Sequence, residues 1–157
     1  MYQLEVKYWL VEYHFNPANG WIITVDIDAM ERAHGGKHPE DKKVRAAIAE
    51  KKLIELGANI GAHPIYGRTD VVAEHPVHGV FLVEVEGKSS RQTEQAVYSA
   101  LGQILLLMRG GTEKYVLAVP DNKKWENQIQ KIPKYVCDQL ALSCILVSKE
   151  GVREKNA

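Results

Sequence analysis

The apolar positions near the start of the chain favour β-strands. Residues 3–13 and 21–28 are rich in aromatic and β-branched side chains, which are typical of strands. Between them, Asn16-Pro-Ala-Asn-Gly20 has the composition of a tight turn. We therefore predict a β-hairpin extension over residues 1–35, linked to the rest of the chain by a glycine-containing segment at 33–39.

From residue 39 onward the pattern predicts helices and strands packed as an α/β fold. A helix is expected over residues 39–56, where Val44, Ala47, Ile48 and Ile54 follow a helical spacing and Gly57 stands at the C-cap position. Further elements are expected in this order: strands at 60–65, 69–74 and 79–86, a helix at 93–108, a strand at 114–119, a helix at 125–140 broken near Pro133, and a strand at 143–147. This order predicts a mixed sheet flanked by helices.

The chain has the length of one domain. Its 157 residues suffice for a single hydrophobic core. We expect residues 1–157 to form one domain, consisting of the hairpin extension at 1–35, a core at 39–148 and a frayed polar tail at 149–157.

The composition constrains partners and location. Twenty basic residues balance twenty acidic ones, which counts mildly against a nucleic-acid partner, although a neutral total can hide a local basic surface. Cys137 and Cys144 lie in apolar surroundings without metal-ligand spacing, as expected for reduced thiols of a cytoplasmic protein. The longest apolar run, 104–108, is far too short for a membrane span, so no membrane partner is expected.

Acidic residues on two adjacent apolar strands give the most informative chemical pattern. If the turn between the strands is centred on Val77, Glu74 pairs with Val80 and Asp70 lies opposite Glu84. Side chains alternate along a strand, so Glu86 shares the face of Glu84. Carboxylates this close do not both ionise unless a cation joins them, and magnesium accepts one or two carboxylates with waters and a phosphate oxygen. The alternative is a solvated strand face with ordinary surface carboxylates.

The segment from about residue 50 to 119 resembles the PD-(D/E)XK, or restriction-endonuclease-like, nuclease superfamily. Asp70 matches the family's aspartate and Glu86-Gly-Lys88 matches its (D/E)-x-K, but Thr69 replaces the usual preceding proline. The resemblance implies an αβββαβ core, Mg²⁺ or Mn²⁺ as cofactor and hydrolysis of DNA. In a second register Glu84 is the metal ligand and Glu86 replaces the lysine. Both registers remain open at this point.

The resemblance assigns roles to further residues. Asp70, Glu84 and Glu86 are the candidate metal ligands, Lys88 would assist the attacking water, and Gln103 on the following helix would support the site. Relatives often add a helix glutamate, for which Glu50 and Glu55 are candidates. The residues expected to contact DNA phosphates are Arg68, Ser89, Ser90, Arg91 and Gln92.

We therefore expect a metal-dependent deoxyribonuclease that hydrolyses DNA by a Mg²⁺-activated water, with Asp70, Glu84, Glu86, Lys88 and Gln103 as the catalytic candidates. The first alternative is an inactive module that keeps the nuclease fold for nucleic-acid binding or protein assembly. The second is a protein-interaction domain that uses the aromatic residues of the hairpin, for example to form a homodimer. In that case the acidic residues are merely solvated.

Overall fold

A seven-stranded mixed sheet runs through the molecule, in the order β2-β1-β3-β4-β5-β6-β7. The computed structural model describes residues 1–155. The strands are β1 Ile22–Val25, β2 Asn59–Ile60, β3 Val71–His75, β4 Gly79–Val85, β5 Lys114–Pro120, β6 Leu142–Ser148 and β7 Gly151–Glu154. Neighbours β2/β1, β4/β5 and β5/β6 are parallel, whereas β1/β3, β3/β4 and β6/β7 are antiparallel. The predicted mixed α/β sheet is thus confirmed.

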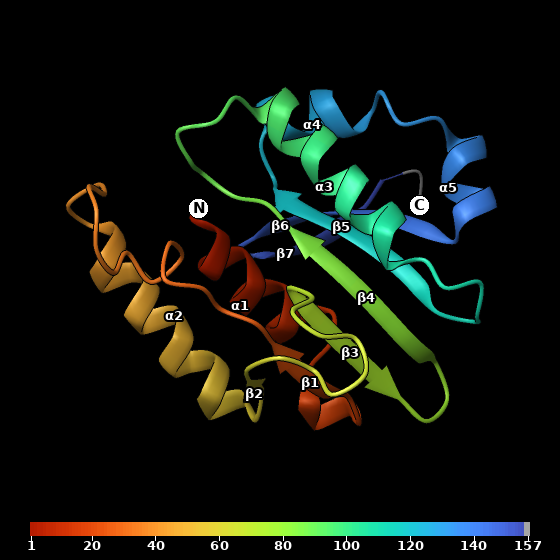
Figure 1. The fold of residues 1–157 in the computed structure, drawn as a ribbon, viewed down its shortest axis with the longest axis horizontal. Helices are drawn as coiled ribbons and strands as arrows, with labels where there is room; N and C mark the ends of the chain where they lie inside the picture. Colours follow the sequence, from red (N-terminus) through yellow and green to blue (C-terminus); the bar gives the residue numbers. More distant parts are fainter. Residues whose placement is uncertain (156–157) are drawn as a thin grey trace.

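Helices cover both faces of this sheet (Figure 1). They are α1 Gln3–Tyr13, α2 Lys42–Leu56, α3 Thr93–Leu107, α4 Lys123–Ile129 and α5 Lys134–Leu140. Because side chains alternate along β3, Val71 and Ala73 pack into the core formed with α1 and α2, whereas Val72 packs into the core under α3 and α4. The sheet is therefore buried on both sides, which explains its continuous apolar strands.

The N-terminal hairpin prediction was wrong. Residues 3–13 form helix α1, and the Asn16–Gly20 turn, which contains the short 3₁₀ helix η1 Pro17–Asn19, joins α1 to β1. Leu4, Val6 and Leu10 are fully buried. Their spacing also fits a strand in which every second side chain faces the core. The helix forms because Leu4, Leu10 and Val11 also lie on one helical face, and tertiary packing on the sheet outweighs the strand propensity of the aromatic residues.

Two further predictions need correction. The strand predicted at 60–65 is reduced to β2, and residues 63–67 form a loop closed by the His63–Gly67 bridge. The predicted polar tail contains strand β7, which pairs antiparallel with β6; residues 156–157 of that tail lie outside the described part. β7 is an edge strand whose charged residues, Arg153 and Glu154, are exposed, and such strands have no apolar pattern to reveal them.

The remaining elements agree with their predictions. Helix α2 ends at Gly57, which adopts φ = 103° as a C-cap glycine. The helix predicted at 125–140 is divided at Pro133 into α4 and α5. In the stretch from residue 1 to 155, no helix is both long and apolar enough to cross a membrane.

The register of β3 on β4 was also predicted correctly. His75 pairs with Gly79, Glu74 with Val80 and Val71 with Val83. Continuing this register by one residue places Asp70 opposite Glu84. The start of β3 and the end of β4 therefore bring their carboxylates to the same end of the sheet.

Gly87 fixes α1 against the exit of β4. A Cβ atom on Gly87 would lie 2.4 Å from the backbone nitrogen of Gln3, and the Lys88 N–H donates to the carbonyl of Met1 at 2.8 Å. The first turn of α1 thus lies directly on the segment that follows the acidic strand, which only a residue without a side chain permits.

Gly87→Ala is expected to lower the free energy of unfolding by about 1–3 kcal/mol, because the backbone of α1 must shift to admit the methyl group. Gly102→Ala is the matched control, since Gly102 lies inside α3 with no atom within 4 Å of its added Cβ and alanine raises helix stability by about 1 kcal/mol. Urea denaturation measures both. Equal effects of the two substitutions would contradict the close packing at Gly87.

Candidate functional site

A cluster of ionisable side chains lies where β3 begins and β4 ends. Asp70 accepts a hydrogen bond from the Val85 N–H through Oδ2 at 2.9 Å, and its Oδ1 lies 3.4 Å from Lys7 Nζ. Glu84 and Glu86 are each only 8% exposed. The strand pairing supplies Asp70 and the two glutamates, and helix α1 supplies the lysine.

Lys7 is the residue that sequence reasoning missed. Its side chain is 0% exposed, and its ammonium group donates to both oxygens of Glu31 at 2.8 and 2.9 Å and to the Asp26 carbonyl at 2.5 Å. It shares the buried helix face of Leu4 and Leu10, so a lysine at helical spacing among core residues was the available signal. Interpreting this segment as a strand concealed that signal.

The cluster holds more negative than positive groups. Burial alone would lower the pKa of Lys7, but the charges of Asp70 and Glu31 outweigh it and raise that pKa, so the ammonium stays charged. Burial raises the pKa of Glu31 to about 7 in spite of Lys7. One buried ammonium therefore faces several carboxylates, and the excess negative charge must take up protons or another cation.

Glu84 carries the largest shift of these acids. Burial raises its pKa to about 9, and both the charge of Asp70 and a hydrogen bond to it add to the effect. Burial also raises the pKa of Glu86 to about 7, although Arg91 acts in the opposite direction from 3.5 Å. Without a further cation, Glu84 is thus protonated at neutral pH beside Asp70. Strongly shifted pKa values of this kind are frequent at functional sites.

Asp70 and Glu84 line an open cleft of about 530 Å³. Gln103, Leu106 and Leu107 of α3 also line this cleft. Gln103, which the sequence suggested as a supporting residue, is exposed and lines the same cleft as the acidic pair.

A second cavity of about 350 Å³ adjoins the cleft at Asp28, which lines both. This cavity is lined by the acids Glu31 and Glu86 and by the cations Lys42, Lys88 and Arg91. Ser89 and Ser90 also line this cavity, and the Ser89 hydroxyl accepts a hydrogen bond from the Arg91 N–H. Acidic and basic side chains therefore both line the two adjoining cavities.

Lys88 does not reach the acidic pair. Its ammonium lies 5.6 Å from the ring centroid of Tyr2, and the lysine that contacts Asp70 is Lys7. Arg68 lies at the cleft and contacts Asp26 at 3.3 Å. Gln92 is exposed at the N-cap position of α3.

Neither candidate helix glutamate joins the cluster. Glu50 is held by Arg32 through two hydrogen bonds of 2.8 and 3.1 Å. Glu55 is largely exposed and lies 4.0 Å from Lys51 on the same helix. Helix α1, which reaches the acidic pair, brings a lysine there instead of a glutamate.

The acidic pair fits a divalent cation with water-rich coordination better than a cage of protein ligands. Within the described residues, no three His, Cys, Asp or Glu side chains are arranged as a metal-binding group, so Glu86 does not complete a three-carboxylate site with Asp70 and Glu84. Magnesium needs only one or two carboxylates beside waters and phosphate oxygens. The opposed carboxylates of Asp70 and Glu84, open to the cleft, provide that donor set.

The stability of the metal-free protein is expected to fall as pH rises between the unfolded pKa of Glu84, 4.5, and its folded pKa of about 9. In this window the folded state holds a proton that the unfolded state has lost, so the slope reaches about 1.4 kcal/mol per pH unit for one group. Glu84→Gln should reduce the slope and be more stable than the wild type at neutral pH.

Urea denaturation in chelator, from about pH 5 to about pH 8, measures this slope. Glu55→Gln is the control, because Glu55 is exposed. An unchanged slope in Glu84→Gln would show that Glu84 does not hold the extra proton.

Comparisons with protein-family models, with curated proteins and with solved structures find no match to this chain.

Proposed function

We propose that this protein is a metal-dependent nuclease that hydrolyses DNA phosphodiesters at the pair Asp70 and Glu84. The observation that carries the proposal is this pair of opposed carboxylates at the end of two antiparallel strands, with the buried ammonium of Lys7 3.4 Å from Asp70. Two carboxylates that line an open cleft could hold the metal ion that magnesium-dependent phosphodiester hydrolysis uses.

The order of the elements supports the same proposal. Helix α1, strands β1, β3 and β4, helix α3 and strand β5 follow one another as αβββαβ, with three antiparallel strands and a fourth parallel to the third. Helix α2 and strand β2 are then an insertion between the first and second core strands. In this assignment Asp70 directly precedes the second core strand and Glu84 lies on the third, as in the superfamily that the sequence resembles.

The geometry favours the register Glu84-Val-Glu86 over Glu86-Gly-Lys88. Glu84 lies opposite Asp70 across the strand pair, whereas Lys88 lies against Tyr2. The lysine that contacts Asp70 is Lys7 of helix α1 and not a lysine on the strand. Because Lys7 is completely buried and its ammonium contacts Glu31 and Asp70, we infer that it positions Asp70 and does not touch the substrate.

Asp70 and Glu84 would hold the ion, Mg²⁺ or Mn²⁺, through one or both carboxylates. Once bound, it would place positive charge against the scissile phosphate and make a nearby water more acidic. Gln103, which lines the same cleft, would orient that water or a phosphate oxygen by hydrogen bonding. The protein thus supplies the geometry that an in-line displacement needs.

The cations around the two cavities suit a phosphate backbone. Arg68 is 70% exposed beside the cleft, and Arg91, with Ser89 and Ser90, borders the adjoining cavity. A strand laid across both cavities would bring its phosphates to these groups while one phosphodiester lies over the acidic pair. Such contacts fix the position of DNA without reading its sequence.

The direct test is cleavage of end-labelled single-stranded, double-stranded and branched DNA by the wild-type protein with Mg²⁺ or Mn²⁺. We expect cleavage of at least one substrate that stops in chelator and in Glu84→Gln but persists in the control Glu55→Gln. Absence of cleavage on every substrate with both metals, or full activity of Glu84→Gln, would contradict the proposal.

A second candidate is a nucleic-acid-binding module that keeps this arrangement without catalysis. It is favoured by the absence, among residues 1–155, of a three-ligand metal group and by the position of Lys88 against Tyr2, while the lysine that contacts Asp70 is Lys7. Salt-dependent DNA binding that weakens in Arg68→Ala or Arg91→Ala, without any cleavage, would support this candidate.

A further inference from the structure

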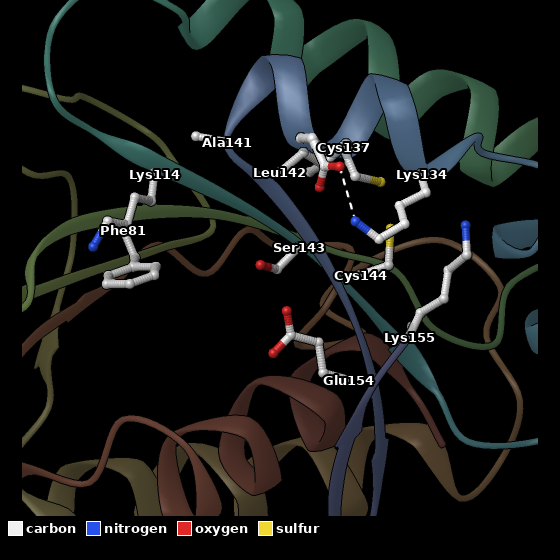
Figure 2. A pocket seen from close by; sticks show the side chains of 11 residues that line it. Phe81, Lys114, Lys134, Cys137, Ala141, Leu142, Ser143, Cys144, Glu154 and Lys155 are labelled. Carbon is white, nitrogen blue, oxygen red and sulfur yellow. Dashed lines mark hydrogen bonds and ion pairs between the residues drawn. The ribbon is translucent and has the colours of Figure 1, made fainter. Parts of the chain in front are cut away.

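The two cysteines of the chain lie on neighbouring elements, helix α5 and strand β6, away from the acidic cluster. Cys137 lies at the centre of α5 and Cys144 in β6, with only the tight turn at Ala141 between the two elements. Both line one cavity of about 350 Å³, and Figure 2 shows their sulfur atoms pointing toward each other. Both thiols are free.

We propose that Cys137 and Cys144 form a redox-active dithiol, a modification site that reacts with a low-molecular-weight disulfide such as glutathione disulfide to form an intramolecular disulfide. This reaction requires two thiols that can come into bonding contact and a route for the small disulfide to one of them.

The two thiols differ in access, which sets the order of the steps. Cys137 is half-buried, whereas Cys144 is only 2% exposed. Burial and the neighbouring Cys137 raise the pKa of the Cys144 thiol to about 12, so Cys144 does not attack first. Cys137 is therefore the entry point for the small disulfide, and Cys144 the thiol that resolves the intermediate.

The cavity offers positive charge for an anionic disulfide. Lys114, Lys134 and Lys155 line it, against the acids Asp138 and Glu154. Lys134 pairs with Asp138 at 2.9 Å, whereas Lys114 donates to the carbonyl of His78. The ammonium groups of Lys114 and Lys155, which donate to the backbone carbonyls of His78 and Ile132, would attract the carboxylates of glutathione disulfide to this cavity.

The reaction balances without another reagent. The Cys137 thiolate attacks one sulfur of the small disulfide, forming a mixed disulfide and releasing one small thiolate. The Cys144 thiolate then attacks the Cys137 sulfur, the protein disulfide forms, and the second small thiolate leaves. The small disulfide accepts the two electrons, and the two protons lost by the cysteines pass to the released thiolates.

Helix α5 is the element that this disulfide would fix. It has no buried residue, and Tyr135 on it is 71% exposed. The turn that follows it contains Ala141 at φ = 51°, a left-handed conformation that is unfavourable for alanine. A covalent link from α5 to β6 would hold a helix whose side chains are at most partly buried.

Intact-mass spectrometry of the folded protein, incubated with glutathione disulfide at a series of times, tests the proposal. We expect the wild type to lose two hydrogen atoms in mass and to carry no stable adduct. Cys144→Ser should stop with one glutathione attached, and Cys137→Ser should remain unmodified. In urea, iodoacetamide should alkylate both cysteines of the reduced wild type. This result would show that the different reactivity of Cys137 and Cys144 depends on the folded structure.

Hydrogen exchange supplies an independent readout of the link. Amides of α5 should exchange at least several-fold more slowly after oxidation and recover when a reductant is added. Cys144→Ala replaces Cys144→Ser if the serine variant does not fold. A wild type that accumulates only a glutathione adduct, or that stays unreacted while folded, would overturn the proposal.

Discussion

Replacing Lys7 by methionine is expected to lower the free energy of unfolding by about 3–5 kcal/mol at neutral pH. The change removes the buried ammonium that contacts Glu31 and Asp70 and leaves the Glu31 carboxylate, 5% exposed, without its cation. Because the remaining acids can escape this cost by protonation, the loss should be smaller at acidic pH. Urea denaturation at several pH values measures it.

Two variants make this prediction specific. Lys51→Met removes a lysine that is 79% exposed and should change the stability by less than about 0.5 kcal/mol. The double substitution of Lys7 and Glu31 by methionine should restore much of the loss, since a buried ion pair can often be replaced by apolar groups of similar size. A loss below about 1 kcal/mol in Lys7→Met would show that Lys7 does not neutralise the cluster.

Asp70→Asn is expected to reduce metal-dependent DNA cleavage by at least about 100-fold, because even residues behind metal ligands typically contribute 10- to 100-fold. Asparagine keeps an oxygen that can accept the hydrogen bond from the Val85 N–H, so the fold should survive. The variant loses the negative charge that Lys7 and a divalent cation both require. Initial rates on the best DNA substrate, with circular dichroism as a folding check, measure the effect.

The matched control for Asp70→Asn is Asp138→Asn, since Asp138 lies on α5 and, within residues 1–155, forms an ion pair only with Lys134. That variant should cleave at the wild-type rate. If Asp70→Asn is as active as Asp138→Asn, Asp70 has no part in the chemistry.

The acidic pair could be predicted from sequence because a short turn fixes its register. The segment His75-Pro-Val-His-Gly79 closes β3 onto β4, with His75 paired to Gly79, and every later pair then follows by counting. The carboxylates of Asp70 and Glu84 were placed opposite one another by this argument alone, since a strand register depends on local turn geometry.

The lysine of the cluster could not be found in the same way. Lys7 belongs to a segment whose apolar residues fit strand and helix spacing alike, and only packing against the sheet decides between them. Reading that segment as a hairpin put Lys7 far from Asp70, and it left Lys88, by its place in the motif, as the expected cation. The contact of Lys7 with Asp70 depends on the position of a whole helix, which local patterns do not specify.

The excess negative charge of the cluster is the reason to expect a divalent metal ion there. Glu84 is protonated at neutral pH in the metal-free protein because burial and Asp70 raise its pKa to about 9. Lys7 already interacts with Asp70 and Glu31, so it cannot neutralise Glu84 as well. A divalent ion between Asp70 and Glu84 would supply the missing positive charge in the cleft.

Calorimetric titration of the metal-free wild type with Mn²⁺ or Mg²⁺, beside Asp70→Asn and Asp138→Asn, tests this claim most directly. We predict saturable binding of a divalent ion to the wild type and to Asp138→Asn, and loss of that binding in Asp70→Asn. Absence of binding to the wild type, or equal binding by all three proteins, would contradict the proposed metal site.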